Sequence, residues 1–376
     1  MSFVFKSPLN GGKLKHFCFT IHKDLLPLNT DIFSLPMRND NPIIDFNSTG
    51  DYSFPSVLDG DPVLATFNNF TINAGHTVTV QNRCKGLYLN ILGDLVVNGT
   101  LSMTARGCIA EGRDVAVSPL LRTIMYLDDI EQLDEKYRNH FPLFIPKEGG
   151  LGGAGVYLSQ SETGTVKNDY GKPGGTKSRG TGGGGSGGIY VNWSGKGTTG
   201  SGSKGTSFSG GSGGGGVGMS HQNHTAGSGE PNGGAGGLAK ANSSASDVKR
   251  QAGGGAGNPG GLGAFRITDT YKNTKNGQSG TGGLLILMVK GSIIVNGSIQ
   301  SHGSNGGQGN YAGMGGSSGG GVIDVYHGRD IIGIERVTAI GGTTKGYNSA
   351  MLNDGGAGSV CIQHISDLPY MPTIIV

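Results

Sequence analysis

Glycine is the residue that most constrains what this chain can fold into. Ten glycines lie in residues 1–148 and 65 lie in residues 149–376, which together make the 75 glycines of the 376-residue chain. Ordering the backbone costs roughly 1–2 kcal/mol of conformational entropy per residue, and glycine loses more freedom than any other residue. A folded glycine-rich half therefore needs dense backbone hydrogen bonding, and an ordinary enzyme core is not expected.

The glycine-rich part at residues 149–283 differs from two common glycine-rich classes. Its clusters are irregular and poor in proline, which excludes the strict Gly-X-Y period of collagen. Large side chains are interspersed between the clusters, which a flexible linker would lack. They are Tyr157, Tyr170, Tyr190, Trp193, Phe208, Met219, Phe265 and Tyr271. We therefore expect this part to be ordered, with disorder as the alternative.

One ordered form that suits glycine clusters is the polyglycine II helix, with three residues per turn and a rise of about 3.1 Å per residue. This helix has no internal hydrogen bonds. Chains without Cβ atoms can, however, pack side by side and exchange N–H···O=C bonds and weak Cα–H···O contacts. The sequence thus predicts an inserted bundle of polyglycine II helices.

A repeated motif brackets the glycine-rich part. Residues 87–107 recur 198 positions later as residues 285–305, with the shared frame L-x(5)-G-x(3)-V-N-G-[ST]-[LI]. Within each copy the apolar residues lie two positions apart, which is the spacing of one face of a strand. Apolar residues also match between the copies, as Leu95 matches Ile293. Each copy is predicted to be a short β coil.

The turn in each copy is an Asn-Gly pair, Asn98-Gly99 in the first and Asn296-Gly297 in the second. Asn and Gly most readily supply the two positive φ values of a tight reversal. We therefore expect both pairs to form tight turns between strands.

Further segments resemble the repeat. Residues 70–80 carry the same pattern upstream, residues 320–342 look like a degraded copy, and residues 358–365 supply a final strand. Short strands that cannot bury a face alone must stack. The predicted fold is mainly β, with stacked short strands in a β-helix-like or sandwich-like arrangement.

One α-helix is expected in the insertion at residues 118–148. Ser118 is a favoured N-cap, Pro119 suits the first helical position, and the helix would end near His140. The residues at helical spacing are Leu120, Ile124, Leu127, either Ile130 or Glu131, Leu133 and Tyr137.

These elements divide the chain into five parts. They are an extended N-terminal attachment region at 1–68, a β-coil repeat at 69–117, the helical insertion at 118–148, the glycine-rich body at 149–283, and a second β-coil repeat with C-terminal strands at 284–376.

Charge and cysteine content exclude several functions. The net charge is only +3 and no run of Lys or Arg stands out, so no nucleic-acid partner is expected. The four cysteines are scattered without a C-x-x-C pair, which fits neither a zinc site nor a disulfide scaffold. No apolar stretch reaches eighteen residues and no signal peptide is visible, so we expect neither membrane insertion nor secretion, and no cofactor.

The glycine runs at 182–188 and 210–216 resemble those of the distal tail-fibre adhesins of T-even-like phages. The resemblance implies a bundle of polyglycine helices whose intervening segments bind a host surface receptor, either an outer-membrane protein or a glycan. It also implies a virion protein that is assembled in the host cytoplasm and contacts other virion proteins. Those adhesins lack the bracketing β repeats. A homotrimer stays open, since fibres are commonly trimeric, but no heptad supports one here.

Five residues of the glycine-rich body are the candidate receptor contacts: Tyr190, Trp193, Phe208, Met219 and His221. Aromatic faces give large contact areas at low entropic cost and stack on sugars or fill pockets. Trp193 is the only tryptophan, and its alternative role is to plug the end of the glycine bundle.

Two other functions stay open from the sequence. The first is a capsid or tail decoration protein, in which the glycine body is a stiff layer without a receptor. The second is a polysaccharide depolymerase, which needs a pair of carboxylates. The candidates are Glu230, Asp269, Asp324 and Asp330. No metal site is expected, because His221 and His224 have no third ligand nearby.

Overall fold

The computed structural model describes backbone and side chains for residues 43–108, 149–155, 172–189, 199–216, 253–258, 260–261, 277–307, 314–344 and 353–364. It describes the backbone alone for strand residues 2–9, 13–20, 115–118, 123–126, 157–158, 167–169, 190–192, 197–198, 217–220, 224–226 and 239–240. Within these residues the protein is mainly β, and its one helical element is the 3-10 turn η4 at Ile334–Arg336.

Three five-stranded parallel sheets form the body that we call the coil. The first sheet has the order β3 (Phe46–Asn47), β6 (Phe70–Ile72), β9 (Leu95–Val97), β21 (Ile293–Val295) and β24 (Ile331–Ile332). The second has β4 (Tyr52–Phe54), β7 (Thr77–Val80), β10 (Thr100–Ser102), β22 (Ser298–Gln300) and β25 (Val337–Thr338). The third has β5 (Val63–Phe67), β8 (Leu87–Ile91), β20 (Leu284–Val289), β23 (Val322–His327) and β26 (Ser359–His364).

Each rung of the coil gives one strand to each sheet, in the order first, second, third. The rungs are β3-β4-β5, β6-β7-β8, β9-β10-β20, β21-β22-β23 and β24-β25-β26. This β-helix-like stacking of short strands is the one that the repeats predict. The copies at 70–80, 320–342 and 358–365 supply strands of the second, fourth and fifth rungs.

The long repeat sets the register of neighbouring rungs. Leu285 pairs with Leu87 and Ile293 pairs with Leu95, so the two copies of the motif stack directly on each other. Their shared apolar positions face inward and are fully buried. A side-chain ladder follows the same offset, since Thr100 and Ser298, 198 residues apart, share a hydrogen bond of 3.3 Å. The repeat therefore predicts the core of the coil correctly.

The Asn-Gly pairs form turns, but these turns are corners between sheets and not hairpins. The flanking strands pair with the rungs above and below, not with each other. None of Asn98, Gly99, Asn296 and Gly297 has a positive φ, so the expected reversal is wrong. Gly99 is required for a different reason: a Cβ there would lie 2.2 Å from the carbonyl oxygen of His76. The Asn296 Nδ2 donates to Asn98 Oδ1 at 2.8 Å, which joins the stacked corners.

The α-helix predicted to begin at Ser118 is wrong where the structure describes this segment. Ser118 is the last residue of β11 (Val115–Ser118), which pairs antiparallel with β12 (Thr123–Tyr126). Ile124, expected on the apolar side of the helix, lies in β12. β-Branched residues in both segments favour extended backbone, and cross-strand pairing overrides the helical spacing. Residues 127–148 lie outside the described residues.

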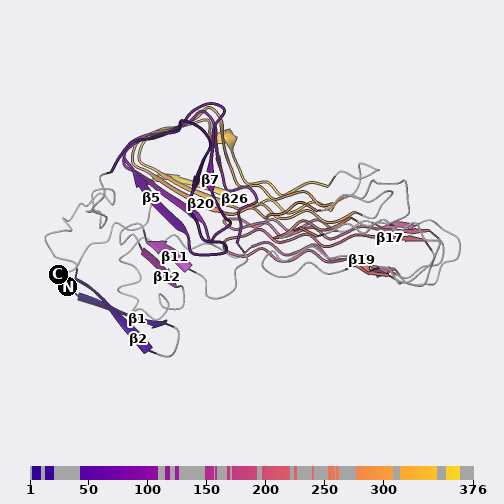
Figure 1. The fold of residues 1–376 in the computed structure, drawn as a ribbon. Coiled ribbons are helices and arrows are strands. Elements are labelled where there is room, and N and C mark those ends of the chain that lie inside the picture. Colours follow the sequence, from indigo (N-terminus) through magenta and orange to yellow (C-terminus); the bar gives the residue numbers. More distant parts are fainter. Residues whose placement is uncertain are drawn as a thin grey trace.

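The glycine runs form a rod that projects from the coil (Figure 1). The chain leaves the coil after β10, β22 and β25 and re-enters it at β20, β23 and β26. All three excursions therefore start at the same corner, between the second and third sheets. The described runs are 149–155, 172–188, 199–216, 253–258, 260–261, 277–283, 301–307, 314–321, 339–344 and 353–358.

Hydrogen bonds join each run to several others. The N–H groups of residues 182–188 donate in turn to three neighbouring runs, and every third donor returns to the same run at an acceptor three residues earlier in the sequence. The bonds, 2.8–3.0 Å long, are Gly182 to Gly320, Gly183 to Gly175, Gly184 to Ser203, Gly185 to Ser317, Ser186 to Lys172, Gly187 to Gly200 and Gly188 to Met314. These contacts supply the dense backbone bonding that the glycine content requires.

The runs approach one another too closely for most side chains. A Cβ on Gly184 would lie 1.9 Å from the carbonyl oxygen of Ser212, and a Cβ on Gly202 would lie 1.9 Å from that of Gly184. Serines occur inside the rod, where their hydroxyls are bonded: Ser203 Oγ and Ser212 Oγ are 2.9 Å apart and both residues are buried. The interior of the rod is thus backbone with a few small polar side chains.

The boundaries of these bodies differ from the expected ones. The coil begins at Phe46, inside the range 1–68 expected to be an attachment region. The β segments at 69–117 and 284–376 contribute to a single coil. Preceding the coil, β1 (Ser2–Leu9) and β2 (Lys13–Thr20) form an antiparallel pair.

Substitution of one rod glycine tests the close approach. We expect Gly184→Ala to lower the free energy of unfolding by about 1–3 kcal/mol, because backbone atoms of a neighbouring run must move to admit the Cβ. Thermal unfolding and resistance to protease measure this effect. The matched control is Gly50→Ala, since no heavy atom lies within 4 Å of a Cβ at Gly50, and we expect a change of about 0.5 kcal/mol or less. Equal effects of the two substitutions would contradict this account of the rod.

Candidate functional site

Strands that connect successive glycine runs lie at the end of the rod that is away from the coil. Figure 1 shows β17 (Val217–Ser220) and β19 (Ala239–Lys240) at this far end. Two small sheets are formed by strands that connect glycine runs. One has the order β13 (Tyr157–Leu158), β16 (Gly197–Thr198), β18 (His224–Ala226) and β19, and the other has β14 (Lys167–Asp169), β15 (Ile189–Asn192) and β17. The far end is therefore the candidate functional surface.

Two of the predicted contact residues lie on paired strands at this end. Tyr190 is in β15 and Met219 is in β17, and these strands pair in parallel with Tyr190 opposite Gly218 and Val191 opposite Met219. Two glycine runs, 199–205 and 209–216, separate these residues in the sequence, but their strands are neighbours in the structure. Trp193 and His221 lie outside the described residues.

Phe208 is wrong as a receptor contact. It belongs to the turn between the runs 199–205 and 209–216, at the coil end of the rod, and its side chain is only 1% exposed. It packs with Tyr88 and Leu284 in an apolar cluster on the outer face of the third sheet. A glycine run that reverses next to the coil meets an apolar surface, so the large side chain at this turn is buried.

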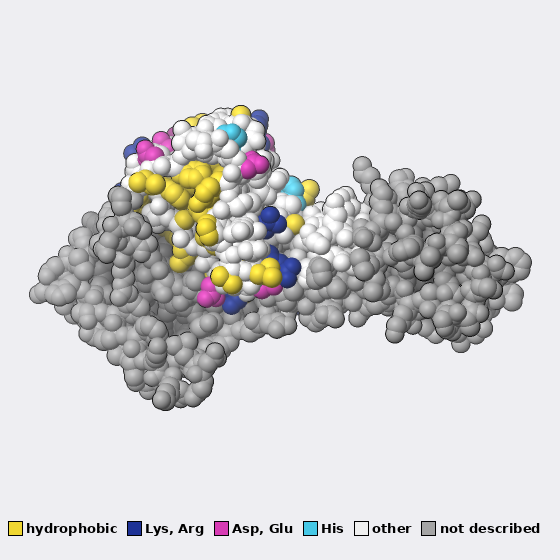
Figure 2. All heavy atoms as spheres, viewed as in Figure 1, with side chains coloured by type: hydrophobic (Ala, Val, Ile, Leu, Met, Phe, Trp, Pro, Cys, Tyr) yellow, Lys and Arg dark blue, Asp and Glu magenta, His cyan; other side chains and the backbone are white. Residues whose placement is uncertain are grey.

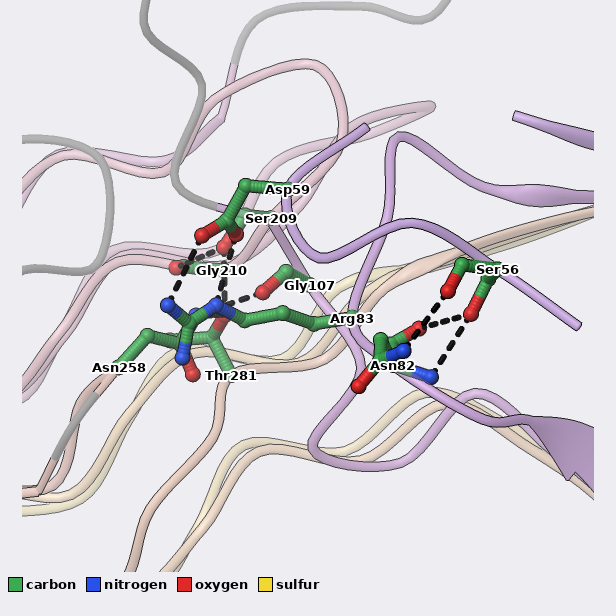
Figure 3. Close-up of polar contacts among 9 residues, drawn as sticks. All are labelled: Ser56, Asp59, Asn82, Arg83, Gly107, Ser209, Gly210, Asn258 and Thr281. Carbon is green, nitrogen blue, oxygen red and sulfur yellow. Dashed lines mark hydrogen bonds and ion pairs between the residues drawn. The ribbon is translucent and has the colours of Figure 1, made fainter. Parts of the chain in front are cut away.

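A network of buried polar groups joins the rod to the coil (Figure 3). Asn258 Nδ2 donates to the carbonyl oxygen of Gly107 at 2.6 Å and to Thr281 Oγ1 at 3.1 Å. Ser209 Oγ lies 2.5 Å from Thr281 Oγ1 and donates to the carbonyl oxygen of Gly210 at 3.1 Å. Asn258, Ser209 and Thr281 are at most 1% exposed. Satisfied buried networks favour one arrangement of the groups that they join, so this network fixes the base of the rod.

An ion pair lies close to the same junction in Figure 3. Arg83 donates to both carboxylate oxygens of Asp59, at 2.7 and 2.8 Å. Asp59 has a positive φ of 54° and lies in the corner between the second and third sheets of the first rung. A bidentate pair of this kind fixes the geometry of both side chains, and so it ties the first two rungs together.

Asp324 is a buried titratable group of the coil. It lies in the middle of β23, paired with Ile286 on one side and Cys361 on the other. Burial raises the pKa of Asp324 to about 6, and the charge of Arg179 partly opposes this shift. Arg179 belongs to a turn of the rod and has a positive φ of 58°. Asp324 therefore couples the base of the rod electrostatically to the coil.

The carboxylates considered for depolymerase chemistry do not form a catalytic pair in the described residues. The pKa of Asp324 is set by burial and by Arg179, with no carboxylate among the causes. Asp330 is exposed in the corner that precedes β24. Glu230 and Asp269 lie outside the described residues. Nothing in this geometry places two carboxylates across a shared substrate position.

Hydrophobic side chains gather on the coil in the view of Figure 2, where the first rungs lie towards the viewer. Phe46 stacks on Phe70 with ring centroids 4.3 Å apart and packs edge-on against Tyr52 at 5.3 Å and Phe67 at 5.5 Å. Tyr52 is 39% exposed, and exposed apolar residues lie nearby in the chain. They are Ile44, Val57 and Leu58. We call this surface the aromatic end of the coil.

Comparison with known proteins found no family model, curated protein or solved structure that matches this chain. The described part of the chain contains no helix that is long and apolar enough to cross a membrane. It also contains no group of three or more His, Cys, Asp or Glu residues placed to hold a metal ion. Function must therefore be argued from the geometry alone.

The pKa of Asp324 predicts how stability depends on pH. The folded protein holds this proton up to about pH 6, whereas the unfolded chain loses it near 3.8, so stability should fall as pH rises from about 4 to above 6. We expect Asp324→Asn to remove this decline, which amounts to at most about 3 kcal/mol at 1.36 kcal/mol per pKa unit. Chemical denaturation at a series of pH values measures it. The control Asp330→Asn, at an exposed position, should keep the pH dependence of the unmodified protein.

Proposed function

We propose that this protein is a non-catalytic attachment protein of a bacteriophage virion, which binds a receptor on the host surface with the far end of its rod. The observation that carries the proposal is that the strands between successive glycine runs assemble at one end, away from the coil. The rod, where the structure describes its interior, is closely packed backbone with a few small polar side chains. Its geometry suits the presentation of variable segments at a distance from the body.

In this proposal the glycine runs are polyglycine II helices. The bonding of residues 182–188 to three neighbouring runs, with a period of three residues, is the pattern expected of a helix with three residues per turn. The close approach of the runs adds support, since a Cβ on Gly213 would lie 1.9 Å from the carbonyl oxygen of Gly316. Such a bundle is stiff because its hydrogen bonds run between helices in several directions.

Four residues are the proposed receptor contacts: Tyr190, Trp193, Met219 and His221. Tyr190 and Met219 belong to the paired strands β15 and β17 at the far end. In the sequence, Trp193 directly follows β15 and His221 directly follows β17. Aromatic, Met and His side chains suit contact with an outer-membrane protein or a glycan.

The aromatic end of the coil is the proposed contact with other virion proteins. Edge strands β3, β4 and β5 are terminal in all three sheets there. Half-exposed aromatic residues on such an edge are typical of a surface that another protein covers. With this arrangement the protein would be held at one end and would bind the host at the other, as a component assembled in the host cytoplasm and acting outside the cell.

Binding of labelled full-length protein to a panel of bacterial strains tests the proposal. We expect saturable binding to some strains, with at least about tenfold weaker affinity for the variant in which Tyr190 and Trp193 are both changed to Ala, as for aromatic hot spots. The control is Tyr52→Ala, which removes an exposed aromatic side chain at the aromatic end and should leave binding to cells unchanged.

The alternatives give different results in the same experiment. A decoration protein would be folded and resistant to protease but would bind none of the strains. A depolymerase would release reducing ends from surface polysaccharide. Equal weakening of cell binding by Tyr52→Ala and by the double variant would contradict a receptor site at the far end.

A further inference from the structure

The backbone bonds of the rod do not by themselves fix how far each glycine run extends. The run 209–216 bonds to the run 182–188 at every third residue, and donor and acceptor both advance by three along their chains. These bonds are Gly211 to Gly182 and Gly214 to Gly185, at 2.8 and 2.9 Å. A shift of one run by three residues would therefore place a new donor at each acceptor. Such weakly specified register is typical of glycine-rich segments, so residues outside the run must hold it in position.

The turn that precedes the run 209–216 blocks a shift of this run away from the coil. Such a shift by three residues would bring Ser207 to the place of Gly210, where a Cβ would lie 2.0 Å from the carbonyl oxygen of Gly319. The turn is also anchored, because the side chain of Phe208 is 1% exposed and belongs to the apolar cluster on the outer face of the third sheet. The coil end of the run is therefore fixed.

The first residue of β17 blocks a shift in the opposite direction. Moving the run by three residues towards the coil would bring Val217 to the place of Gly214, where a Cβ would lie 2.1 Å from the carbonyl oxygen of Gly200. The eight residues 209–216 thus lie between two blocking positions. Their number, and not the backbone bonds alone, determines where β17 begins.

The position of the run is passed directly to the far end of the rod. β15 begins at Ile189, immediately after the run 182–188, and β17 begins at Val217, immediately after the run 209–216. Ile189 and Val217 pair in parallel. Because no residue separates run from strand in either chain, one extra helical turn of three residues in one run would move its strand past the other by about 9 Å.

We propose that the length of the run 209–216 positions the receptor surface, because it holds β17 in register with β15. This role rests on the proposed function, since it takes these two strands as part of the receptor surface and the runs as polyglycine II helices. The eight residues of the run span about 25 Å at a rise of about 3.1 Å per residue. Ser207 and Phe208, at the coil end, thereby influence receptor binding without touching the receptor.

A disulfide between β15 and β17 measures their register. Val191 and Met219 are paired residues of these strands, so Val191→Cys combined with Met219→Cys should give a disulfide, which requires a Cα separation of at most about 7 Å. The linked peptide is detected by mass spectrometry after oxidation of the full chain. Three glycines inserted after Gly213 should abolish this link, because they move position 219 by about 9 Å along β15.

A matched insertion provides the control. Three further glycines inserted after Gly187 lengthen the run 182–188 by the same turn and should restore the link. A single glycine inserted after Gly213 turns the rest of its run by about one third of a helical turn and should lower resistance to protease, whereas the three-glycine insertion should not. In chains without the added cysteines, cell binding should weaken at least about tenfold with the three-glycine insertion in one run, as for loss of a central contact, and recover with the matched insertion.

Three results would overturn the proposal. The first is retention of the link after insertion into one run alone, because strand pairing and not run length would then set the register. The second is failure of the matched insertion to restore the link. The third is equal loss of protease resistance after insertion of one and of three glycines. A link that is lost and restored as expected, with unchanged cell binding in every length variant, would support the register role and contradict the proposed function.

Discussion

The scarcity of Cβ atoms in the rod is the constraint on which the rest of the structure depends. Neighbouring runs lie so close that a Cβ at Gly184 or Gly211 would come within 1.9 Å of a carbonyl oxygen of another run. This proximity allows N–H groups of one run to bond to three others, which offsets the large entropic cost of ordering glycine. Because the runs are held along their length, the segments between them are carried to a common end.

The coil supplies the base on which the rod is built. Strands of the second and third sheets continue directly into glycine runs, so the register of the rungs also sets the relative position of the runs. The buried contacts of Asn258 with Gly107 and Thr281 reinforce this connection. The two bodies are thus parts of one backbone hydrogen-bond system, although one is filled with aliphatic side chains and the other with almost none.

The sequence predicts much of the fold but little of the site. The repeat at 87–107 and 285–305 predicts the strands, their register and the core. When similar layers stack, equivalent residues of the two copies become neighbours in space. Local sequence patterns predict the wrong structure where contacts with other segments determine it. Cross-strand pairing replaces the helix expected from Ser118, and the coil surface buries Phe208. Asn258 at the junction carries no sequence signal, since its partner Gly107 is 151 residues away. The aromatic end had one available signal, the density of Phe and Tyr residues between 46 and 70.

The single corner through which the chain enters and leaves the rod has a mechanical consequence. A pull on the far end reaches the coil through three rungs at once, by way of β10 and β20, β22 and β23, and β25 and β26. Such a load acts along the runs and shears many hydrogen bonds together, whereas a load across one edge strand would open them one at a time. In the proposed attachment role, this direction of loading would resist drag on the attached particle.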